Sequence, residues 1–374
     1  MLKGIHLTLM IGPAVPRPVP QSLIDALTHV QVTSGKDRSG FQLTFAVSKR
    51  SLLMTTLLPA GYFDPIVTRV IITVTLGGVP NVLIDGIVTR QEITPSNQPG
   101  ESTLTITGDD LTVAMDLVQK IIPFPNLPIV ARLYLTLAPY ALLGVVPVVI
   151  PPPIIAVKTV LQGWNTQHDT DLNLIRSLAQ RVGYVFYVQP GPLPGQSIAY
   201  FGPDIRVPVP QNALTMNMDA HTNVESLSFS LDGLAKKVSI FNVLDPITKK
   251  ISIPIPLPNI NAFKPPLGAR PTPPAKIEFA NNSAAMEPDE GAQAILAFLL
   301  TNSNAITGSG SLDVLRYGRV LQSRMLVGVR GAGFAYDGMY FVDSVTHDIK
   351  HGQYKQNFTL SRDGLNPSRP TVPV

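Results

Sequence analysis

The stretch VRGAGFAYDGMYFVDSVTHDIKHGQYKQNFTLSRDGL, residues 329–365, is the most regular part of the chain. A glycine-rich turn leads into two segments whose side chains alternate in sidedness, and a short polar break at His351-Gly352 separates them. Period-two alternation is typical of β-strands that have one face against a core. The stretch therefore predicts two neighbouring strands joined by a tight turn.

The composition of the rest of the chain limits the class of protein. At 374 residues, the chain is long enough for two or three domains. Charged residues make up 14%, whereas an ordinary soluble domain carries about 25%, so the chain must bury more surface than usual or lie in a membrane. The net charge of +4 comes without a dense Lys/Arg cluster, which argues against nucleic-acid binding. The absence of cysteine excludes disulfides, thiolate metal sites and cysteine nucleophiles.

One segment resembles a membrane span. Residues 133–157 carry no charge, and a run of about 25 apolar residues is the length that a transmembrane helix needs. Prolines at 139, 147 and 151–153 interrupt the run, and each proline inside a helix costs about 3 kcal/mol. We therefore expect an extended apolar loop or a buried strand, with a membrane-facing element as the alternative. The N-terminus lacks the long apolar core of a secretory signal and is interpreted as a first strand.

The first region, residues 1–117, is predicted to be rich in strands. Alternation in 41–47 and in 70–76 indicates strands with one face on a core, and Gly77-Gly78 is suited to a hairpin turn. Asp109-Asp110 precedes a short apolar run, where either carboxylate can cap a helix. Several short strands at this spacing predict a small barrel or sandwich.

The second region, residues 118–205, begins with the apolar proline-rich insert and then becomes α/β. Asp169 or Thr170 is expected to cap an amphipathic helix that ends at Gly183, and residues 184–188 are expected to form a strand. This helix-then-strand unit predicts a small α/β subdomain.

The third region, residues 206–374, returns to strands. A proline-rich connector at 256–274 is expected to lie against another part of the protein, and residues 287–301 are expected to form a helix with Pro288 in its first turn. Extended runs are predicted at 226–229, 237–243, 250–255 and within 314–365. The chain therefore reads as β, then α/β, then β.

The six histidines provide no convincing metal or catalytic site. They are His6, His29, His168, His221, His347 and His351. A zinc site needs three or four converging ligands, and the four-residue spacing of His347 and His351 falls on a strand and a turn. His168-Asp169 and the pair Asp343 and His347 are the best acid–histidine neighbours. We interpret these histidines as solvated or cap-related, and His347 as structural.

Other motifs are equally weak. Gly308-Ser309-Gly310-Ser311 has only the composition of a nucleophile elbow and is interpreted as a flexible polar loop. Gly331-Ala332-Gly333 lacks a following helix, so it is a turn rather than a phosphate-binding loop. No carboxylate pair stands out for glycoside hydrolysis, and the single tryptophan, Trp164, does not indicate a sugar-binding cleft. We predict no catalytic, cofactor-binding or metal-binding residue, and a protein that is not an enzyme.

Three patches, in a fixed order, carry a family resemblance. They are the corner 105–110, the helix and strand within 169–187, and a C-terminal pattern made of Gly333-Phe334, residues 336–342, residues 344–347, residues 352–354, Phe358 and Arg362. Together they resemble the phage late control gene D family, the hub proteins of contractile phage tails and related contractile injection systems. Each patch alone is weakly specific, and their order across most of the chain carries the resemblance.

The resemblance implies a fold and an assembly. It implies a mostly β protomer with two tail-tube-like β-barrel domains, residues 1–117 and 206–374, and a small α/β subdomain at 118–205. It also implies a structural homotrimer whose six barrels stack under a hexameric tail tube while the other side holds a trimeric spike. Because the chain ends soon after the C-terminal pattern, a separate spike protein is expected.

The same resemblance implies a location and partners. The protein would be made in the bacterial cytoplasm and would reside in the tail baseplate of a virion or in an injection particle, next to other baseplate proteins. Nucleic acid would only pass through the lumen. The low charge fits this role, because large permanent interfaces resemble a domain core cut in half; residues 133–157 and 251–275 would then be packing arms. The alternatives are a peptidoglycan-degrading tail enzyme and a membrane-associated scaffold.

Overall fold

The structure is a computed structural model. It describes residues 4–13, 15–36, 38–98, 101–124, 127–153, 165–205, 210–244, 252–257, 264–279, 288–300 and 304–368.

The elements follow the predicted order of β, α/β and β. The first β region contains β1 (Ile5–Pro13), β2 (Arg17–Pro18), α1 (Gln21–Ala26), β3 (Leu27–Ser34), β4 (Ser39–Ala46), the π-helical turn η1 (Leu53–Leu57), β5 (Thr68–Leu76), β6 (Val79–Thr94), β7 (Thr103–Asp110) and α2 (Thr112–Met115). The α/β region contains β8 (Ile122–Phe124), α3 (Ile129–Leu137), the 3-10 helix η2 (Ala138–Leu143), β9 (Val145–Val149), β10 (Asn165–Gln167), α4 (Asp171–Val182), β11 (Val185–Pro190) and β12 (Ser197–Gly202). The last region contains β13 (Gln211–Thr215), the 3-10 turn η4 (Asp219–His221), β14 (Val224–Leu231), β15 (Lys237–Leu244), β16 (Ser252–Leu257), β17 (Gly268–Pro271), β18 (Lys276–Phe279), α5 (Pro288–Leu300), β19 (Ile306–Asp313), α6 (Val314–Tyr317), β20 (Leu326–Arg330), β21 (Gly338–Lys350), β22 (Gln353–Arg362) and β23 (Gly364–Pro367).

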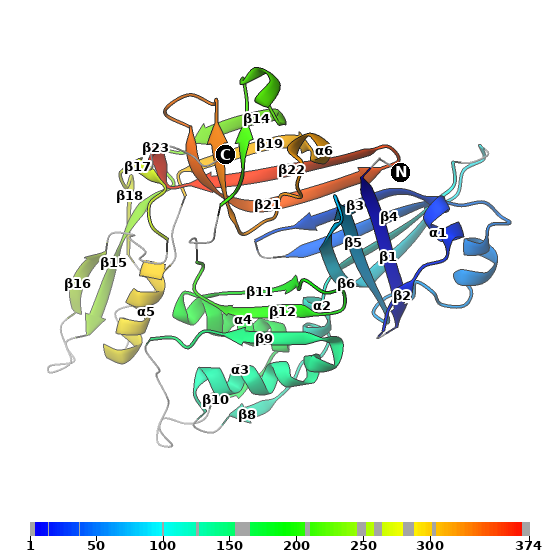
Figure 1. The fold of residues 1–374 in the computed structure, drawn as a ribbon. Helices are drawn as coiled ribbons and strands as arrows, with labels where there is room; N and C mark the ends of the chain where they lie inside the picture. The colour runs from blue at the N-terminus through cyan, green and yellow to red at the C-terminus, as the bar shows by residue number, and fades with distance from the viewer. Residues whose placement is uncertain are drawn as a thin grey trace.

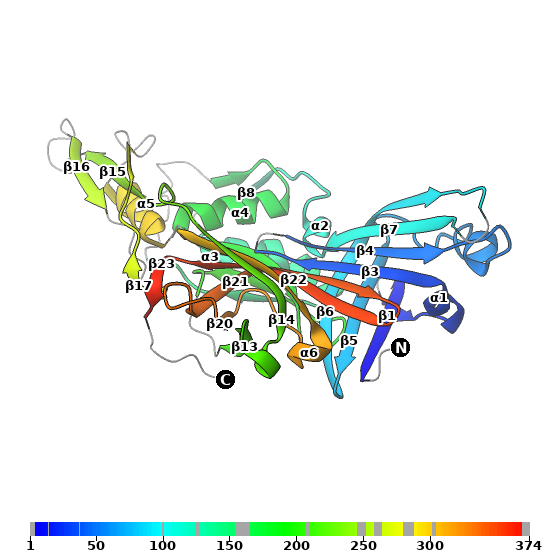
Figure 2. The ribbon, with the colours of Figure 1, turned by 90° about the horizontal axis from the view of Figure 1, so that it is seen from above.

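The two β regions share one 13-stranded sheet. Its main path runs β14-β19-β22-β21-β3-β4-β7-β6-β5-β1-β2, with β13 and β20 attached beside β21. The antiparallel pairing of β21 with β3 joins the regions, with Val345 opposite Ser34 and Lys350 opposite His29. Figures 1 and 2 show these strands, blue and orange, lying side by side although they are far apart in the sequence. The fold is mostly β with an α/β insertion, as predicted, whereas the number of barrels and the domain boundaries stay predictions.

The segments whose apolar and polar residues alternate form strands with one buried face. Phe41, Leu43 and Phe45 of β4 point into a hydrophobic core that also contains Phe358 and Leu360 of β22. Thus the two β regions share this core as well as the sheet. The predicted turns are confirmed at Gly77-Gly78, between β5 and β6, and at His351-Gly352, between β21 and β22. Glycine serves these turns because its backbone readily adopts a positive φ.

The α/β region has a separate core beneath the large sheet (Figure 1). The predicted helix is α4: Thr170 caps it by accepting a hydrogen bond from the backbone N–H of Asn173, and Gly183 ends it in the left-handed conformation. α4 covers one face of the three-stranded sheet β11-β12-β9. A buried ion pair fastens this region to the large sheet: Arg69 binds Asp85 with nitrogen–oxygen distances of 2.7 and 2.6 Å, and Ser197 donates to the same carboxylate at 3.2 Å.

The expectation that residues 133–157 form an extended loop or a buried strand is wrong for residues 133–143, which are helical. Residues 133–137 belong to α3 and residues 138–143 to η2, where Pro139 lies in the first turn and therefore breaks no hydrogen bond. The strand alternative holds for β9, which pairs in parallel with β12, and residues 154–157 lie outside the described residues. In the described part of the chain, no helix is long and apolar enough to cross a membrane.

Two further expectations needed correction. The segment Gly308-Ser309-Gly310-Ser311 is not a loop but the middle of β19. Leu111, not Asp109 or Asp110, stands at the N-cap position of α2, although Asp110 does accept a free backbone N–H at the start of that helix, as expected. Asp110 ends β7 and accepts the backbone N–H of Thr112 at 3.0 Å.

Apart from the strand at residues 308–311 and the short helix α6 at the start of the last predicted β unit, the predictions for the last region hold where the structure describes it. The helix predicted at 287–301 is α5, the connector contributes β17, which pairs with β23, and the predicted extended runs are strands. Residues 250–251, 258–263, 287 and 301 lie outside the described residues.

Candidate functional surfaces

One face of the large sheet is polar over most of its width. Inward side chains of β3, β4, β7, β19, β21 and β22 enter the core, so their alternate residues lie on the other face. On that face the register aligns hydroxyl and amide side chains across neighbouring strands. One such row is Ser226, Ser311, Asn357, Thr346 and Thr33, and a second is Ser228, Ser309, Thr359 and Ser344.

These hydroxyl groups bond to one another across the strands. The oxygen–oxygen distances are 2.8 Å for Ser226 and Ser311, 2.9 Å for Ser228 and Ser309, and 2.7 Å for Ser344 and Thr359. The glycines that alternate with the serines of β19 have a packing reason. A Cβ on Gly310 would lie 2.4 Å from the carbonyl oxygen of Ser226 and 2.6 Å from the ring of Phe358.

Charged residues on this polar face are paired with opposite charges. Lys355 lies 2.8 Å from Glu225, Arg38 lies 2.6 Å from Asp109, and Arg90 lies 2.7 Å from Glu92. The hydrogen bond that Lys355 donates to Glu225, followed by the charge of that carboxylate, raises the pKa of Lys355. Within each pair, the positive and the negative charge largely cancel. The polar face (defined by the two rows and these pairs) is therefore hydrophilic without strong charge of either sign.

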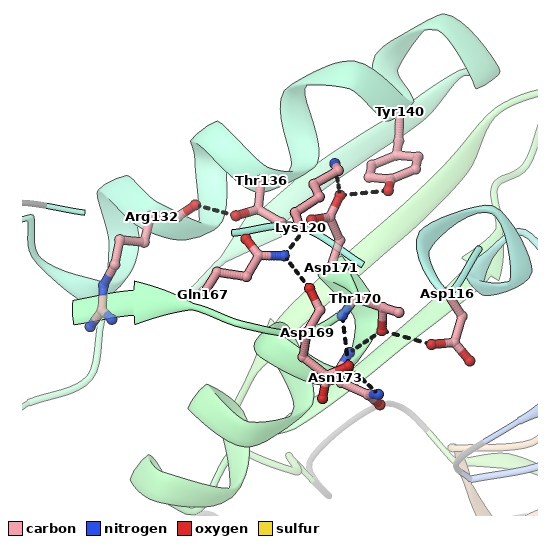
Figure 3. Close-up of polar contacts among 10 residues, drawn as sticks. All are labelled: Asp116, Lys120, Arg132, Thr136, Tyr140, Gln167, Asp169, Thr170, Asp171 and Asn173. Atoms are coloured by element: carbon pink, nitrogen blue, oxygen red, sulfur yellow. Dashed lines mark hydrogen bonds and ion pairs between the residues drawn. The ribbon is translucent and has the colours of Figure 1, made fainter. Parts of the chain in front are cut away.

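A polar network organises the α/β region at the start of α4 (Figure 3). Asp171 is 1% exposed and accepts three bonds: from Lys120 at 2.5 Å, Tyr140 at 2.7 Å and Gln167 at 2.8 Å. Burial, followed by the hydrogen bond to Asp171, raises the pKa of Tyr140. These partners come from the segment after α2, from η2 and from β10, so one carboxylate fixes three chain segments to α4.

The neighbouring capping residues extend this network. Thr170 donates to Asp116 at 2.7 Å, and Asp169 accepts hydrogen bonds from Asn173 and from the backbone of Thr170, which lower the pKa of Asp169. Gln119 forms an isolated bridge with Thr170. The segment of residues 116–122 is therefore held along the N-terminal end of α4.

Apolar side chains are exposed on both sides of this region. Between α2 and β8, Leu117, Val118, Ile121 and Ile122 are 49%, 60%, 78% and 39% exposed. On β9, Val146 and Val148 are 51% and 42% exposed. Exposed apolar groups gathered in this way mark interaction sites more often than chance.

Two of the six histidines, His347 and His29, are held by side-chain contacts in the structure. His347 lies on β21 and is buried, so the solvated interpretation is wrong for it and the structural interpretation holds. Its Nδ1 lies 2.7 Å from the hydroxyl of Tyr354 and 3.2 Å from the amide of Gln356, and desolvation lowers its pKa to about 3. His29 pairs with Asp348 at 3.1 Å.

The remaining motifs also have structural explanations. His168 is exposed beside the Asp169 turn, and His6 and His351 are exposed as well. Gly331 stands in the turn between β20 and β21 with a positive φ, and Trp164 lies outside the described residues. Among the described residues, no group of three His, Asp or Glu side chains is arranged to hold a metal ion.

Sequence reasoning missed the residues that organise these surfaces. The sequence pattern singled out Asp169 and Thr170, which are typical capping residues, and gave no reason to choose Asp171. Only the fold brings Lys120, Tyr140 and Gln167 to its carboxylate. The serines of β14 and β19 carried a usable signal, since both segments alternate serine with larger or smaller residues at period two.

Comparison with known proteins gives a consistent result. No protein-family model and no curated protein sequence matches the chain. Among solved structures, a tail protein from Neisseria meningitidis MC58 is similar with a TM-score of 0.63 and 14% identity, covering 97% of this chain and 98% of that one. The 43 kDa tail protein of prophage MuSo2 from Shewanella oneidensis has a TM-score of 0.56 and 13% identity, covering 96% and 99%.

A third similar structure comes from a secretion machine. The E. coli c3393 protein, described as a type VI secretion system component with similarity to T4 tail proteins gp27 and gp5, has a TM-score of 0.51 and 11% identity, covering 93% of this chain and 78% of that one. At such identities the likeness shows the fold. The resemblance expected from the sequence is confirmed at that level: over nearly its whole length, the chain has the fold of phage tail proteins.

Proposed function

We propose that the chain is a structural baseplate hub of a contractile tail or injection machine. In this proposal it forms a homotrimer that adapts a hexameric tail tube to a trimeric spike, and it contacts other baseplate proteins. The observation that carries the proposal is the polar face, which continues from the last β region into the first without interruption. Support also comes from the similarity to tail-protein structures, which covers 97% and 96% of this chain for the two most extensive comparisons given above.

The polar face suits the lining of a channel. It is hydrophilic, and its charges are cancelled locally by ion pairs, so a passing polymer would meet water and hydroxyl groups instead of a strong field. Its other side is the hydrophobic core of both β regions. A curved sheet with this sidedness supports an arrangement in which the polar face is turned toward a lumen and the core lies outside it.

Two strand edges support self-association. β14 pairs only with β19, and residues 89–94 of β6 pair only with β7 among the described residues. They stand at opposite ends of the polar face. Unpaired edges present N–H and C=O groups that another chain can pair with. Pairing the β14 edge of one protomer with the β6 edge of the next would extend the polar face around a ring.

The molar mass of the purified protein and of its complexes tests the proposal. We expect light scattering on the purified protein to give a trimer, and co-purification with a tube protein and a spike protein of the same machine to give a complex containing all three. Replacing Ile93, which is 43% exposed on the free edge of β6, by lysine places a charge where strands would pair. We expect I93K to raise the concentration needed for trimers at least tenfold.

The matched control is Val79→Lys, at a residue that is 61% exposed at the opposite end of β6, which should leave the trimer unchanged. A wild-type protein that stays monomeric at every concentration, with and without tube and spike partners, would overturn the proposal.

A further inference from the structure

A cavity of about 360 Å³ lies where the three regions of the chain meet. Its walls come from Ser34 and residues 80–83 of the first β region, from residues 189–192 at the end of β11, and from residues 320–324 and His347 of the last region. Small-molecule sites in proteins commonly enclose about 300–1,000 Å³. The cavity therefore has room for a small ligand in contact with all three regions.

The groups on the walls favour a negatively charged ligand. Arg324 contributes a positive charge, and none of the described residues that line the cavity is Asp or Glu. Desolvation raises the pKa of Asp110, and the charge of Arg324 is among the effects that oppose this, but Asp110 does not line the cavity. The hydroxyl groups of Ser34 and Ser323, 2.7 Å apart, add hydrogen-bonding groups to the same walls. The described wall residues are therefore polar, with a net positive charge.

Arg324 is held in one orientation by contacts with the other two regions. Its backbone has a positive φ of 61°, which is uncommon for a residue with a side chain. Its Nη2 donates to the carbonyl oxygens of Gly35 and Lys36 at 2.5 and 3.1 Å, and its guanidinium carbon lies 4.0 Å from the centre of the Tyr187 ring. These contacts fix the guanidinium before a ligand arrives, which lowers the entropic cost of binding.

The hydrogen bonds of His347 fix which of its ring nitrogens carries the proton. His347 is 4% exposed, and its contacts with Tyr354 at 2.7 Å and Gln356 at 3.2 Å are both at Nδ1. Gln356 accepts the backbone N–H of Leu321 through Oε1 at 3.0 Å and donates to the Leu321 carbonyl through Nε2 at 2.9 Å, so the group that it turns toward His347 is the NH₂ donor. Desolvation lowers the pKa of His347 to about 3, so the ring is neutral at pH 7. A neutral imidazole that accepts at Nδ1 carries its proton on Nε2.

The Nε2–H of His347 is left for the cavity. Tyr354 and Gln356 occupy the Nδ1 edge of the ring, so the edge that His347 contributes to the wall carries the Nε2–H. Among the described residues, no acceptor receives this hydrogen. A buried donor without an acceptor is costly, and an oxygen atom of a ligand would remove that cost. A metal ion is disfavoured, because it would need the Nε2 lone pair that the proton occupies.

We propose that this cavity binds a small oxyanion, a carboxylate or a phosphate group, between the guanidinium of Arg324 and the Nε2–H of His347. Hydrogen bonds from charged donors to oxyanions are roughly twice as strong as those between neutral groups, so Arg324 supplies most of the affinity and His347 orients the ligand. Exposed residues at positions 80, 192 and 322 stand among the walls, which gives the ligand a way in. The inference goes beyond the hub function and does not depend on it, because a single chain supplies the walls.

Titration calorimetry on the purified protein tests the site. Inorganic phosphate and succinate are titrated separately at pH 7, with sodium chloride at the same ionic strength as the control for screening. We expect at least one of the two anions to bind at one site per chain with a dissociation constant of about 1 mM or lower, and chloride to show no saturable binding. Binding of only one anion assigns the ligand as a phosphate or a carboxylate. Absence of binding by both anions up to about 50 mM overturns the proposal.

Variants locate the bound anion. Arg324→Gln removes the charge and should weaken anion binding about tenfold or more, and His347→Leu removes the Nε2 donor and should weaken it about threefold or more. The matched control is Arg316→Gln, which removes the same charge from an exposed residue of α6 that does not line the cavity and should bind the anion as the wild type does. Circular dichroism establishes that each variant is folded.

A crystal structure of the wild type with the bound anion locates it without any variant. The anion should contact both Arg324 and His347, and an anion bound elsewhere would overturn the proposal. Unchanged affinity in folded R324Q and H347L, or an equal loss in R316Q, would overturn it as well. A wild type that stays monomeric but binds the anion in this cavity contradicts the hub and supports the site, whereas a trimer that binds neither anion does the reverse.

Discussion

Removing the carboxylate of Asp85 should destabilise the protein strongly. Asp85 and Arg69 are 2% and 5% exposed, and their bidentate pair lies where the large sheet meets the α/β region. Replacing Asp85 by alanine removes the acceptor of two arginine hydrogen bonds, at 2.7 and 2.6 Å, and of the Ser197 hydroxyl at 3.2 Å. The guanidinium of Arg69 then stays buried without its counter-charge.

The expected cost follows from the burial of that charge. Breaking a buried ion pair by removing one partner costs about 3–5 kcal/mol, whereas replacing both partners by apolar residues of similar volume is often neutral. We therefore expect D85A to lose about 3–5 kcal/mol of unfolding free energy, and the double variant R69M/D85L to lose no more than about 1 kcal/mol. The loss of about 1 kcal/mol in R69M/D85L includes the loss of the hydrogen bond that Arg69 donates to the carbonyl of Gly195 at 3.2 Å.

Urea denaturation at pH 7 and one protein concentration measures these differences. The matched control is Glu92→Ala, which breaks the exposed Arg90–Glu92 pair of 2.7 Å and should cost at most about 1 kcal/mol. The reasoning fails if D85A is no more destabilising than E92A, or if R69M/D85L is as unstable as D85A.

Three further predictions concern other buried groups. Desolvation lowers the pKa of His347 to about 3, below the unfolded value of about 6.5. The stability that the neutral imidazole contributes is therefore present above pH 6.5 and is lost as the pH falls toward 3. Between pH 6 and 4, the unfolding free energy of the wild type, measured by urea titration, should fall by about 2–3 kcal/mol more than that of H347Q. Gly310→Ala should cost about 1–3 kcal/mol by overpacking, whereas Gly233→Ala should cost far less, since a Cβ there meets nothing within 4 Å. Asp171→Ala releases Lys120, so limited trypsin digestion should cleave after that residue faster than in wild type.

Each of these predictions has a contrary result. A parallel pH dependence of wild type and H347Q would show that the imidazole is not held neutral by burial. Equal stability of the two alanine variants would remove the packing reason for Gly310. Unchanged cleavage after Lys120 in D171A would mean that the carboxylate does not hold the segment of residues 116–122.

The sequence alone determined the local elements that obey a strong period. β4, β21 and β22 were predictable because their apolar residues alternate, and α4 was predictable because its capping threonine and terminal Gly183 mark both ends. The order of β, α/β and β followed from these elements. The resemblance of the patches to a tail-protein family was also visible in the residues, and the fold agrees with it.

The sequence misled where two physical effects compete at one place. Pro139 was taken to end any helix, yet a proline in a first turn is tolerated, and η2 begins there. The serines and glycines of β19 have the composition of a loop. They form a strand because β19 pairs with β14 on one side and β22 on the other, and the rings of Phe229 and Phe358 fill the space that side chains at Gly308 and Gly310 would need. Packing from residues far away in the sequence overrode the local preference.

Only the tertiary structure decided which surfaces belong together. Period-two patterns show that each strand has two faces, but they do not say which strands are neighbours. The pairing of β21 with β3 is what joins two polar faces into one. Likewise, Asp171 and Lys120 are 51 residues apart, and their contact, which turns Leu117 and Ile121 outward, exists only in the folded chain. The sequence determines elements through local propensity, whereas shared surfaces depend on long-range contacts that local propensity does not specify.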